Sequence, residues 1–309
     1  AMGQPQRVEF GRTLENAVVV LTGTMSMLGD PYVLRVVDRD ATGFSFVVDG
    51  WEYQTSLQSR TETIHWVAVE AGVHTLEDGR VLEAGTVLAD KDSGSVIFSA
   101  DFGSQAPVVV TSVLSSFGGT AVDSDPRNVN RTGFDMRLQV EEARMGLSHG
   151  QELVGYLAIG AGAGTGTVQT DHNARSGSFG QSFTAPVVVA DTQSRNGLDP
   201  RAAMLRSVGS SSVSVFLDEE QSADFEVRHN PDVIGFAAFE LGTLSGVRTG
   251  DAALVTQAEL DALTPDVPVG DLTEIGSSGR VTLNVASAMG QPQRVEFGRT
   301  LENAVVVLT

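Results

Sequence analysis

The sequence AMGQPQRVEFGRTLENAVVVLT occupies residues 1–22 and recurs without a single difference at residues 288–309. Self-similarity at a fixed period is the mark of repeat architectures. The stretch therefore indicates one full period of a tandem array, followed by the first residues of the next unit. The alternative is an artificial duplication of one end of the chain. The junction VTLNVASAMGQPQ (281–293) lacks the composition of a linker, which favours the array.

The composition describes an acidic chain without cysteine. Its 309 residues, 41% of them apolar, are enough for two or three domains. The 39 acidic and 20 basic residues give a formal charge of −19, which argues against a nucleic-acid partner. That charge suits an exported protein, a saline habitat or a surface that binds Ca²⁺. The lack of cysteine excludes disulfides and thiolate chemistry. No apolar run has the length of a membrane span, so we expect no membrane insertion.

Short strand patterns continue from the opening stretch. VVVLTGT (18–24) is a β-branched run of the kind found in buried strands. GFSFVVDGW (43–51) and TIHWVAVEAG (63–72) alternate apolar residues on one face, which is the period of a half-buried strand. No helical period occurs in this part of the chain, so the pattern predicts an all-β fold.

The same pattern returns twice along the chain. The apolar residues of the last strand keep their order and size at shifts of 90 and then 80 positions: Ile64, Trp66 and Ala68 recur as Val154, Tyr156 and Ala158, and as Ile234, Phe236 and Ala238. The valine run 18–20 recurs at 108–110 and 187–189. Conserved size with drifting identity is what a common core requires. We therefore predict three modules, at residues 1–72, 95–162 and 177–242.

The segments between the modules differ in composition. Residues 73–94 contain two turn signals around an apolar run and predict a connecting hairpin, whereas the glycine-rich residues 163–176 predict a flexible connector. Residues 243–287 predict a spacer with one short helix, in which Thr256 is the N-cap and Glu259 completes a capping box. The sequence SSGRVTLNV (277–285) at its end predicts a strand. Residues 288–309 then begin the next repeat.

The first module resembles the H-type lectin domain, the fold of snail agglutinins. The resemblance rests on VEF at 8–10, AVVVLTGT at 17–24, Trp51 after the fourth strand, and IHWVAV at 64–69. The second and third modules resemble a bacterial variant, through APVVV (106–110 and 185–189), RNVNRTGF (127–134), and the endings HGQELVGYLAIGAG and HNPDVIGFAAFELG. The resemblance implies antiparallel β-sandwiches of about six strands. Family members form trimers that bind sugars, often N-acetylgalactosamine, at loops between subunits. Three modules in one chain would then make an intrachain pseudo-trimer.

The resemblance also implies a carbohydrate site in the first module. The family uses an acidic group, an arginine and an aromatic ring against the sugar, and these roles map to Asp30, Arg35, Trp51, Glu52 and Tyr53. The family has a histidine after the tryptophan, whereas this chain has Glu52, so the usual specificity is not expected. The alternative is that Trp51 is a rim residue that caps the sandwich.

The second and third modules lack that tryptophan and instead carry carboxylates near a histidine. Carboxylate clusters on loops hold Ca²⁺, and a histidine among them suits a transition metal. The predicted metal ligands are Glu141, Glu142 and His149 in the second module, and Asp218, Glu219, Glu220, Asp224 and His229 in the third. The alternative is a solvated acidic loop, or a network paired with Arg144, Arg206 or Arg228.

Nothing in the sequence favours catalysis. Adjacent Glu141 and Glu142 point to opposite faces of a strand end, and no GxSxG motif occurs. The sequence therefore predicts a non-catalytic, extracellular repeat unit of a large surface or secreted protein. Its expected partners are cell-surface or matrix glycans, bound as an adhesion module, and neighbouring copies of the same repeat. The alternative is a structural spacer or filament-forming unit that associates end to end without binding sugar.

The second copy of the opening stretch needs a partner. Alone, residues 288–309 would expose the valines at 305–307 along an unpaired strand edge, which proteins avoid. We therefore expect this copy either to pair with another chain or to take the place of residues 1–22 in the first module.

Overall fold

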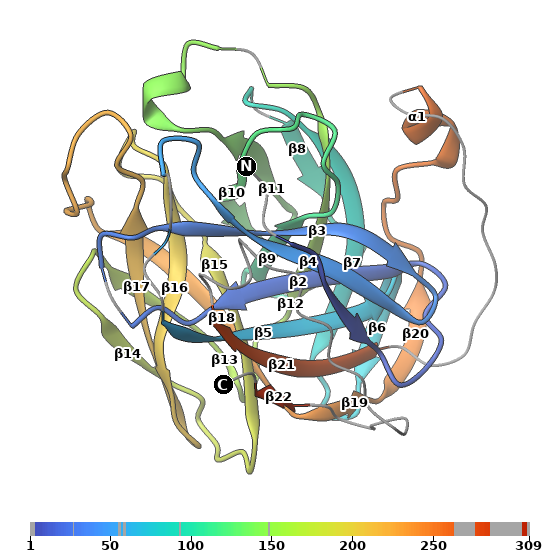
Figure 1. The fold of residues 1–309 in the computed structure, drawn as a ribbon. Coiled ribbons are helices and arrows are strands. Elements are labelled where there is room, and N and C mark those ends of the chain that lie inside the picture. Colours follow the sequence, from blue (N-terminus) through green and yellow to red (C-terminus); the bar gives the residue numbers. More distant parts are fainter. Residues whose placement is uncertain are drawn as a thin grey trace.

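The computed structural model describes residues 4–26, 28–54, 57, 60–92, 94–147, 149–262, 276–284 and 305–307. These residues are almost entirely β-structure, as the alternating patterns predict (Figure 1). The described helical segments are a 3-10 turn, Glu142–Arg144, and one short α-helix, α1 (Gln257–Asp261). Neither is long and apolar enough to cross a membrane.

Eighteen of the strands fall into three groups of six, which we call modules 1, 2 and 3. Module 1 contains β1 (Gln6–Glu9), β2 (Ala17–Gly23), β3 (Tyr32–Asp40), β4 (Gly43–Gly50), β5 (Thr61–Glu70) and β21 (Gly276–Asn284). Module 2 contains β7 (Val81–Ala89), β8 (Gly94–Ile97), β9 (Val108–Val113), β10 (Asp123–Asn130), β11 (Gly133–Gln139) and β12 (Glu152–Ile159). Module 3 contains β13 (Thr165–Thr170), β14 (Arg175–Ser178), β15 (Pro186–Thr192), β16 (Arg201–Val208), β17 (Ser212–Glu219) and β18 (Asp232–Glu240).

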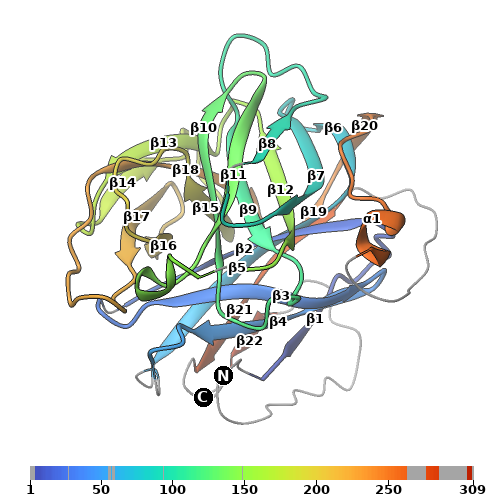
Figure 2. The same cartoon turned by 90° about the horizontal axis from the view of Figure 1, so that it is seen from above.

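The same pairing scheme occurs in each module. The outer sheets are β1-β4-β3, β8-β11-β10 and β14-β17-β16, and all their pairs are antiparallel. The inner sheets are β2-β5-β21, β9-β12-β7 and β15-β18-β13, again antiparallel. One parallel bridge, Arg35 to Val113, joins the outer sheet of module 1 to the inner sheet of module 2. In Figure 2 the inner strands β2, β5, β9, β12, β15 and β18 lie at the centre of the molecule.

The valine runs place these inner strands in two cores at once. In β2, Val19 packs in the core of module 1 whereas Val18 and Val20 face a central cluster shared by all three modules. The valine runs of β9 and β15 divide in the same way between their own module and the central cluster. Alternate side chains of a strand point to opposite faces, so a continuous apolar run is what a strand buried on both faces needs.

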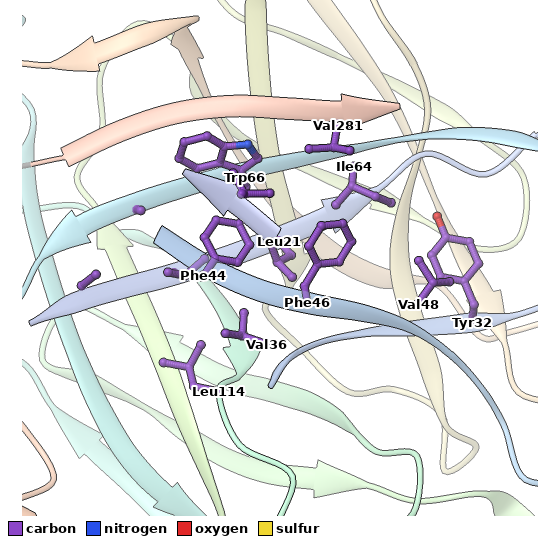
Figure 3. Packing of buried hydrophobic residues seen from close by; sticks show 14 of the residues in the cluster. Leu21, Tyr32, Val36, Phe44, Phe46, Val48, Ile64, Trp66, Leu114 and Val281 are labelled. Atoms are coloured by element: carbon purple, nitrogen blue, oxygen red, sulfur yellow. The ribbon is translucent and has the colours of Figure 1, made fainter. Parts of the chain in front are cut away.

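The core of module 1 is aromatic. Phe44 and Phe46 of β4 lie opposite Ile64 and Trp66 of β5, and Val281 of β21 closes the cluster (Figure 3). The rings of Phe44 and Trp66 meet edge to face, with centroids 5.6 Å apart. Such pairs add to the stabilisation from buried area alone.

The segments between the predicted modules are not all connectors. The hairpin predicted over 73–94 exists as β6 (Gly72–Leu76) and β7, but β7 is also the partner of β12 in module 2. The prediction of a flexible connector over 163–176 is wrong, because this segment forms β13 and β14. The glycines that suggested flexibility serve packing instead, since Gly166 lies against the Phe236 ring.

The predicted spacer, residues 243–287, also carries structure. It includes β20 (Gly246–Gly250), which pairs with β6, and the helix α1, where the predicted capping box is present. The Thr256 hydroxyl accepts from the Glu259 N–H and the Glu259 carboxylate accepts from the Thr256 N–H at 2.8 Å. β19 (Gly242–Leu244), at the start of this segment, pairs with β21, near its end.

The second copy of the opening stretch is described only at β22 (Val305–Val307), and the rest of 288–309 lies outside the described residues. β22 pairs in parallel with β21, with Val306 opposite Val281. The prediction that this copy displaces residues 1–22 is wrong, because β1 and β2 hold their places in module 1.

Truncation of Leu157 to alanine tests whether the modules share one core. Leu157 is fully buried in the central cluster, so L157A should lower the free energy of unfolding by about 2–5 kcal/mol. Urea unfolding followed by circular dichroism, and by the fluorescence of the module 1 tryptophans, should stay a single transition. V247A, at a side chain that is 66% exposed, should change the midpoint little. Separate transitions, only one of them shifted, would contradict a common core.

Candidate functional site

The loops that follow β2, β4, β9, β11, β15 and β17 form one surface, which we call the loop face. Direct contacts join them across modules: the Tyr53 N–H donates to Glu141 at 2.8 Å, and the Glu142 N–H donates to Glu220 at 2.7 Å. In Figures 1 and 2 the green 3-10 turn and the orange loop after β17 lie side by side. The predicted carbohydrate and metal residues all lie on or just beneath this face.

The junction of modules 1 and 2 buries a charge cluster. Arg35 of β3 is fully buried, donates to the Thr120 carbonyl, and lies 4.0 Å from the Glu152 carboxylate. Glu152 accepts from the Ser115 hydroxyl at 2.5 Å and from the Phe117 N–H at 2.9 Å. Arg35 therefore connects two modules instead of facing solvent.

The predicted aromatic residues lie over the same junction. Trp51 is 3% exposed and packs in a small buried cluster with Ala121. Glu52 accepts from the Ala121 N–H at 3.2 Å, and the Tyr53 ring is 39% exposed. The Trp51 ring has no open face for a sugar, and its position is that of a capping residue. Tyr53 is the aromatic of this set that solvent reaches.

The junction of modules 3 and 1 holds Asp30. Its carboxylate forms a buried ion pair with Arg60, whose Nε also donates to Glu62 at 2.9 Å. Glu62 in turn accepts from the Ser26 N–H at 2.9 Å and the Thr24 hydroxyl at 2.8 Å. Asp30 and Arg35 therefore lie in two different junctions, and the structure does not bring them together as one site.

The junction of modules 2 and 3 is the most highly charged. Arg201 is buried and donates to Asp125 at 2.7 Å and to Asp232 at 3.0 Å. Asp125 also accepts from Arg195 at 2.7 Å, and His229 lies 3.5 Å from Asp232. Burial of His229 alone lowers its pKa, but the carboxylates of Asp232 and Glu219, 3.5 and 3.7 Å from its ring nitrogens, raise that pKa above its ordinary value.

One acid recurs in all three junctions, and it is not among the residues predicted from the sequence. Glu62, Glu152 and Asp232 stand at or near the start of the middle strand of each inner sheet and accept hydrogen bonds from the loop that follows β2, β9 or β15. Each also has an arginine within 4.0 Å. The signal was present, because each acid lies two positions before Ile64, Val154 and Ile234, at the same shifts as those landmarks.

Some of the predicted metal ligands are used in hydrogen bonds or ion pairs. Glu141 accepts from Tyr53 and pairs with Arg144 at 2.9 Å, and Asp224 accepts from the Glu226 N–H at 2.8 Å. Within the described residues there is no group of three or more His, Asp or Glu side chains placed to hold a metal ion. The structure therefore does not assemble the predicted ligands around one point.

Buried carboxylates beneath the loop face have altered pKa values. Burial raises the pKa of Asp49 to about 6 and that of Asp218 to about 8. A small pocket of about 40 Å³ between the three modules contains Asp123 and Asp191, and burial raises the pKa of Asp123 to about 7. Desolvation favours the neutral form of each acid.

Unpaired polar atoms gather under this face. Among the described residues, most of the buried side-chain nitrogen and oxygen atoms without a hydrogen-bond partner belong to Arg35, Asp49, His149, Asp218, Glu219, Gln221 and His229. Buried polar atoms are normally paired, and His149 and His229 instead face carboxylates at 3.5–3.9 Å. Most of the large exposed apolar side chains of the described residues also lie on this face: Leu28, Tyr53, Phe117, Met145, Leu147, Leu198 and Phe225.

The chain is similar to halomucin of Haloquadratum walsbyi. The two are 26% identical over 304 residues. The match spans 91% of this chain but only 3% of the length of halomucin. No protein-family model matches the chain, and no solved structure matches it. A segment that aligns almost from end to end with a small part of a very long protein fits a repeat unit of a surface protein.

Asp218 makes stability depend on pH. An acid whose pKa rises from its ordinary 3.8 to about 8 on folding stabilises the protein below pH 4, and this contribution is lost as the pH rises through 8. A shift of one pH unit across this range changes the free energy of unfolding by at most about 1.4 kcal/mol, so the loss between pH 5 and 8 amounts to a few kcal/mol at most. We expect D218N, which stays neutral, to flatten the dependence of the urea midpoint on pH. D251N, on the exposed partner of Arg248, should leave it unchanged. Parallel curves for the wild type and D218N would contradict the assignment.

Proposed function

We propose that this chain is one non-catalytic repeat of a large extracellular surface or secreted protein, and that its loop face binds glycans. The repeat is supported by the identity of residues 1–22 and 288–309 and by the short, nearly end-to-end alignment with halomucin. The acidic charge of −19 suits an exported protein in a saline habitat.

The observation that carries glycan binding is the pair of partly exposed aromatic residues, Tyr53 and Phe117, on a loop face that also carries polar and charged groups. Sugar recognition combines hydrogen bonds to hydroxyl groups with an apolar ring face. Tyr53 and Phe117 are each 39% exposed, whereas Arg35 and Asp49 are buried beneath the face and support its loops. Trp51 is not part of this proposal, because its ring is buried.

An H-type lectin assignment is supported by the threefold recurrence of one six-stranded arrangement around a central cluster. In that family three separate subunits would provide the loops, whereas here one chain provides them. Covalent linkage removes the dependence of assembly on concentration. Repetition of such units along a chain would add avidity to weak sites.

The alternative function is a structural repeat without sugar binding. The observation that favours it is the inward use of the predicted site residues, since Asp30, Arg35 and Trp51 are all buried between modules. In this case the junction charges serve only to hold the loops in place.

A glycan array distinguishes the two functions. The wild-type chain should bind one class of glycan, and Y53A and F117A should each weaken that binding about tenfold, since one lost ring contact is worth roughly 1 kcal/mol or more. I97A is the matched control: Ile97 is 78% exposed but ends β8, on an outer sheet away from the loop face. An array with no binding would favour the structural repeat, and equal binding by all four proteins would contradict a glycan site at Tyr53 and Phe117.

A further inference from the structure

A glycine lies beneath an aromatic ring in the inner sheet of every module. Register places each glycine directly opposite the ring: Gly85–Tyr156, Gly166–Phe236 and Gly279–Trp66. A Cβ at these glycines would lie only 2.5, 2.7 and 2.5 Å from the ring or its hydroxyl. No real side chain tolerates that approach, so each ring requires glycine on the neighbouring strand. β21 is therefore the structural equivalent of β7 and β13.

Chain order sets β21 apart from these two strands. β7 is followed directly by β8, and β13 by β14, each within its own module. β21 is followed in the sequence by residues 288–309, the second copy of the opening stretch, yet it pairs with β5, which precedes it by about two hundred residues. By order it directly precedes the first strands of the next unit, as β7 precedes β8 and β13 precedes β14, and by pairing it completes module 1 of its own chain.

We propose that the slot beside β5 is a docking site for the β21 strand of a second copy of this chain, so that units join by strand donation. The proposal rests on the repeat-unit part of the proposed function and is independent of glycan binding. Residues 1–22 and 288–309 are identical, so β21 is followed along the chain by the β1 and β2 sequence of a second module 1.

The slot recognises this strand by more than backbone pairing. The Ser278 hydroxyl donates to the Glu240 carbonyl at 2.8 Å, and Arg280 donates to the Pro186 carbonyl at 3.4 Å. These acceptors belong to module 3, so the slot is formed by two modules and is complete only when they are assembled. An empty slot would leave the edge of β5 and one face of Trp66 uncovered, and such edges pair with another chain.

The protein concentration decides whether β21 pairs with β5 of its own chain, which we call closure, or with β5 of another chain, which we call donation. A strand in the same chain competes at an effective concentration in the millimolar range, so dilute single units close on themselves. A strand from another chain competes only when the chains approach that concentration or when the units are covalently consecutive. The strand makes the same hydrogen bonds and buries the same side chains in both arrangements.

Cysteine pairing detects the donated strand, because the chain has no cysteine of its own. Ser278 lies directly opposite Val67, a spacing that suits a disulfide. V67C and S278C chains are refolded together and oxidised at total concentrations from about 1 µM to about 1 mM, the range over which donation should overtake closure. We expect a disulfide-linked heterodimer, seen by mass spectrometry, whose fraction rises at least tenfold across that range.

Two variants complete the experiment. The V67C/S278C double variant should form an intrachain disulfide at low concentration, which verifies the register. S278C/G279L should give no heterodimer with V67C, because a side chain at position 279 collides with the Trp66 ring. If the double variant forms its disulfide but the mixed single variants never form a heterodimer, strand donation is refuted, whereas glycan binding by the loop face is unaffected by either result.

Discussion

The whole structure depends on inner strands that are buried on both faces. Val18 and Val20 pack against the other modules while Val19 packs inside module 1, and β9 and β15 repeat the arrangement. A module taken alone would expose one complete face of its inner sheet, an apolar area that isolated soluble domains do not leave uncovered. The modules are therefore parts of one folding unit, and the closure of module 1 by β21 belongs to the same requirement.

The burial of charge at the junctions follows from this architecture. Loops that connect doubly buried strands must turn where two modules meet, so their polar groups lose water and need internal partners. Glu62, Glu152 and Asp232 supply these partners to loop N–H and hydroxyl groups, and a nearby arginine balances each carboxylate. Buried pairs of this kind add little net stability when compared with apolar packing, but removing one partner is expensive. Their effect is to define the loop positions, and with them the geometry of the loop face.

Much of the fold could be predicted from local pattern, and the site could not. The valine runs and the recurring Ile64, Trp66 and Ala68 pattern located the inner strands, and Thr256 with Glu259 predicted the helix start, because these signals act over a few residues. β13 was missed, and the strand predicted at 277–285 was not assigned to module 1, because the glycines of β13 and β21 lie opposite aromatic rings on other strands, a constraint that only the register reveals. The predicted roles of Asp30, Arg35 and Trp51 were taken from the resemblance to the H-type lectin domain. Whether such a side chain faces solvent or a neighbouring module depends on contacts made far away in sequence.

The sequence is more tightly constrained at the junction between consecutive units than at the junctions between modules of one unit. Each interface among modules 1, 2 and 3 meets one fixed neighbour, so its residues can differ from module to module as long as size is kept: Trp66, Tyr156 and Phe236 all fill the same position. A strand that leaves its unit must fit a slot on any copy. The ring beside β21 must then always find glycine opposite it. The identity of residues 1–22 and 288–309, beside the drift among the three modules, means that β21 is always followed by the same first two strands.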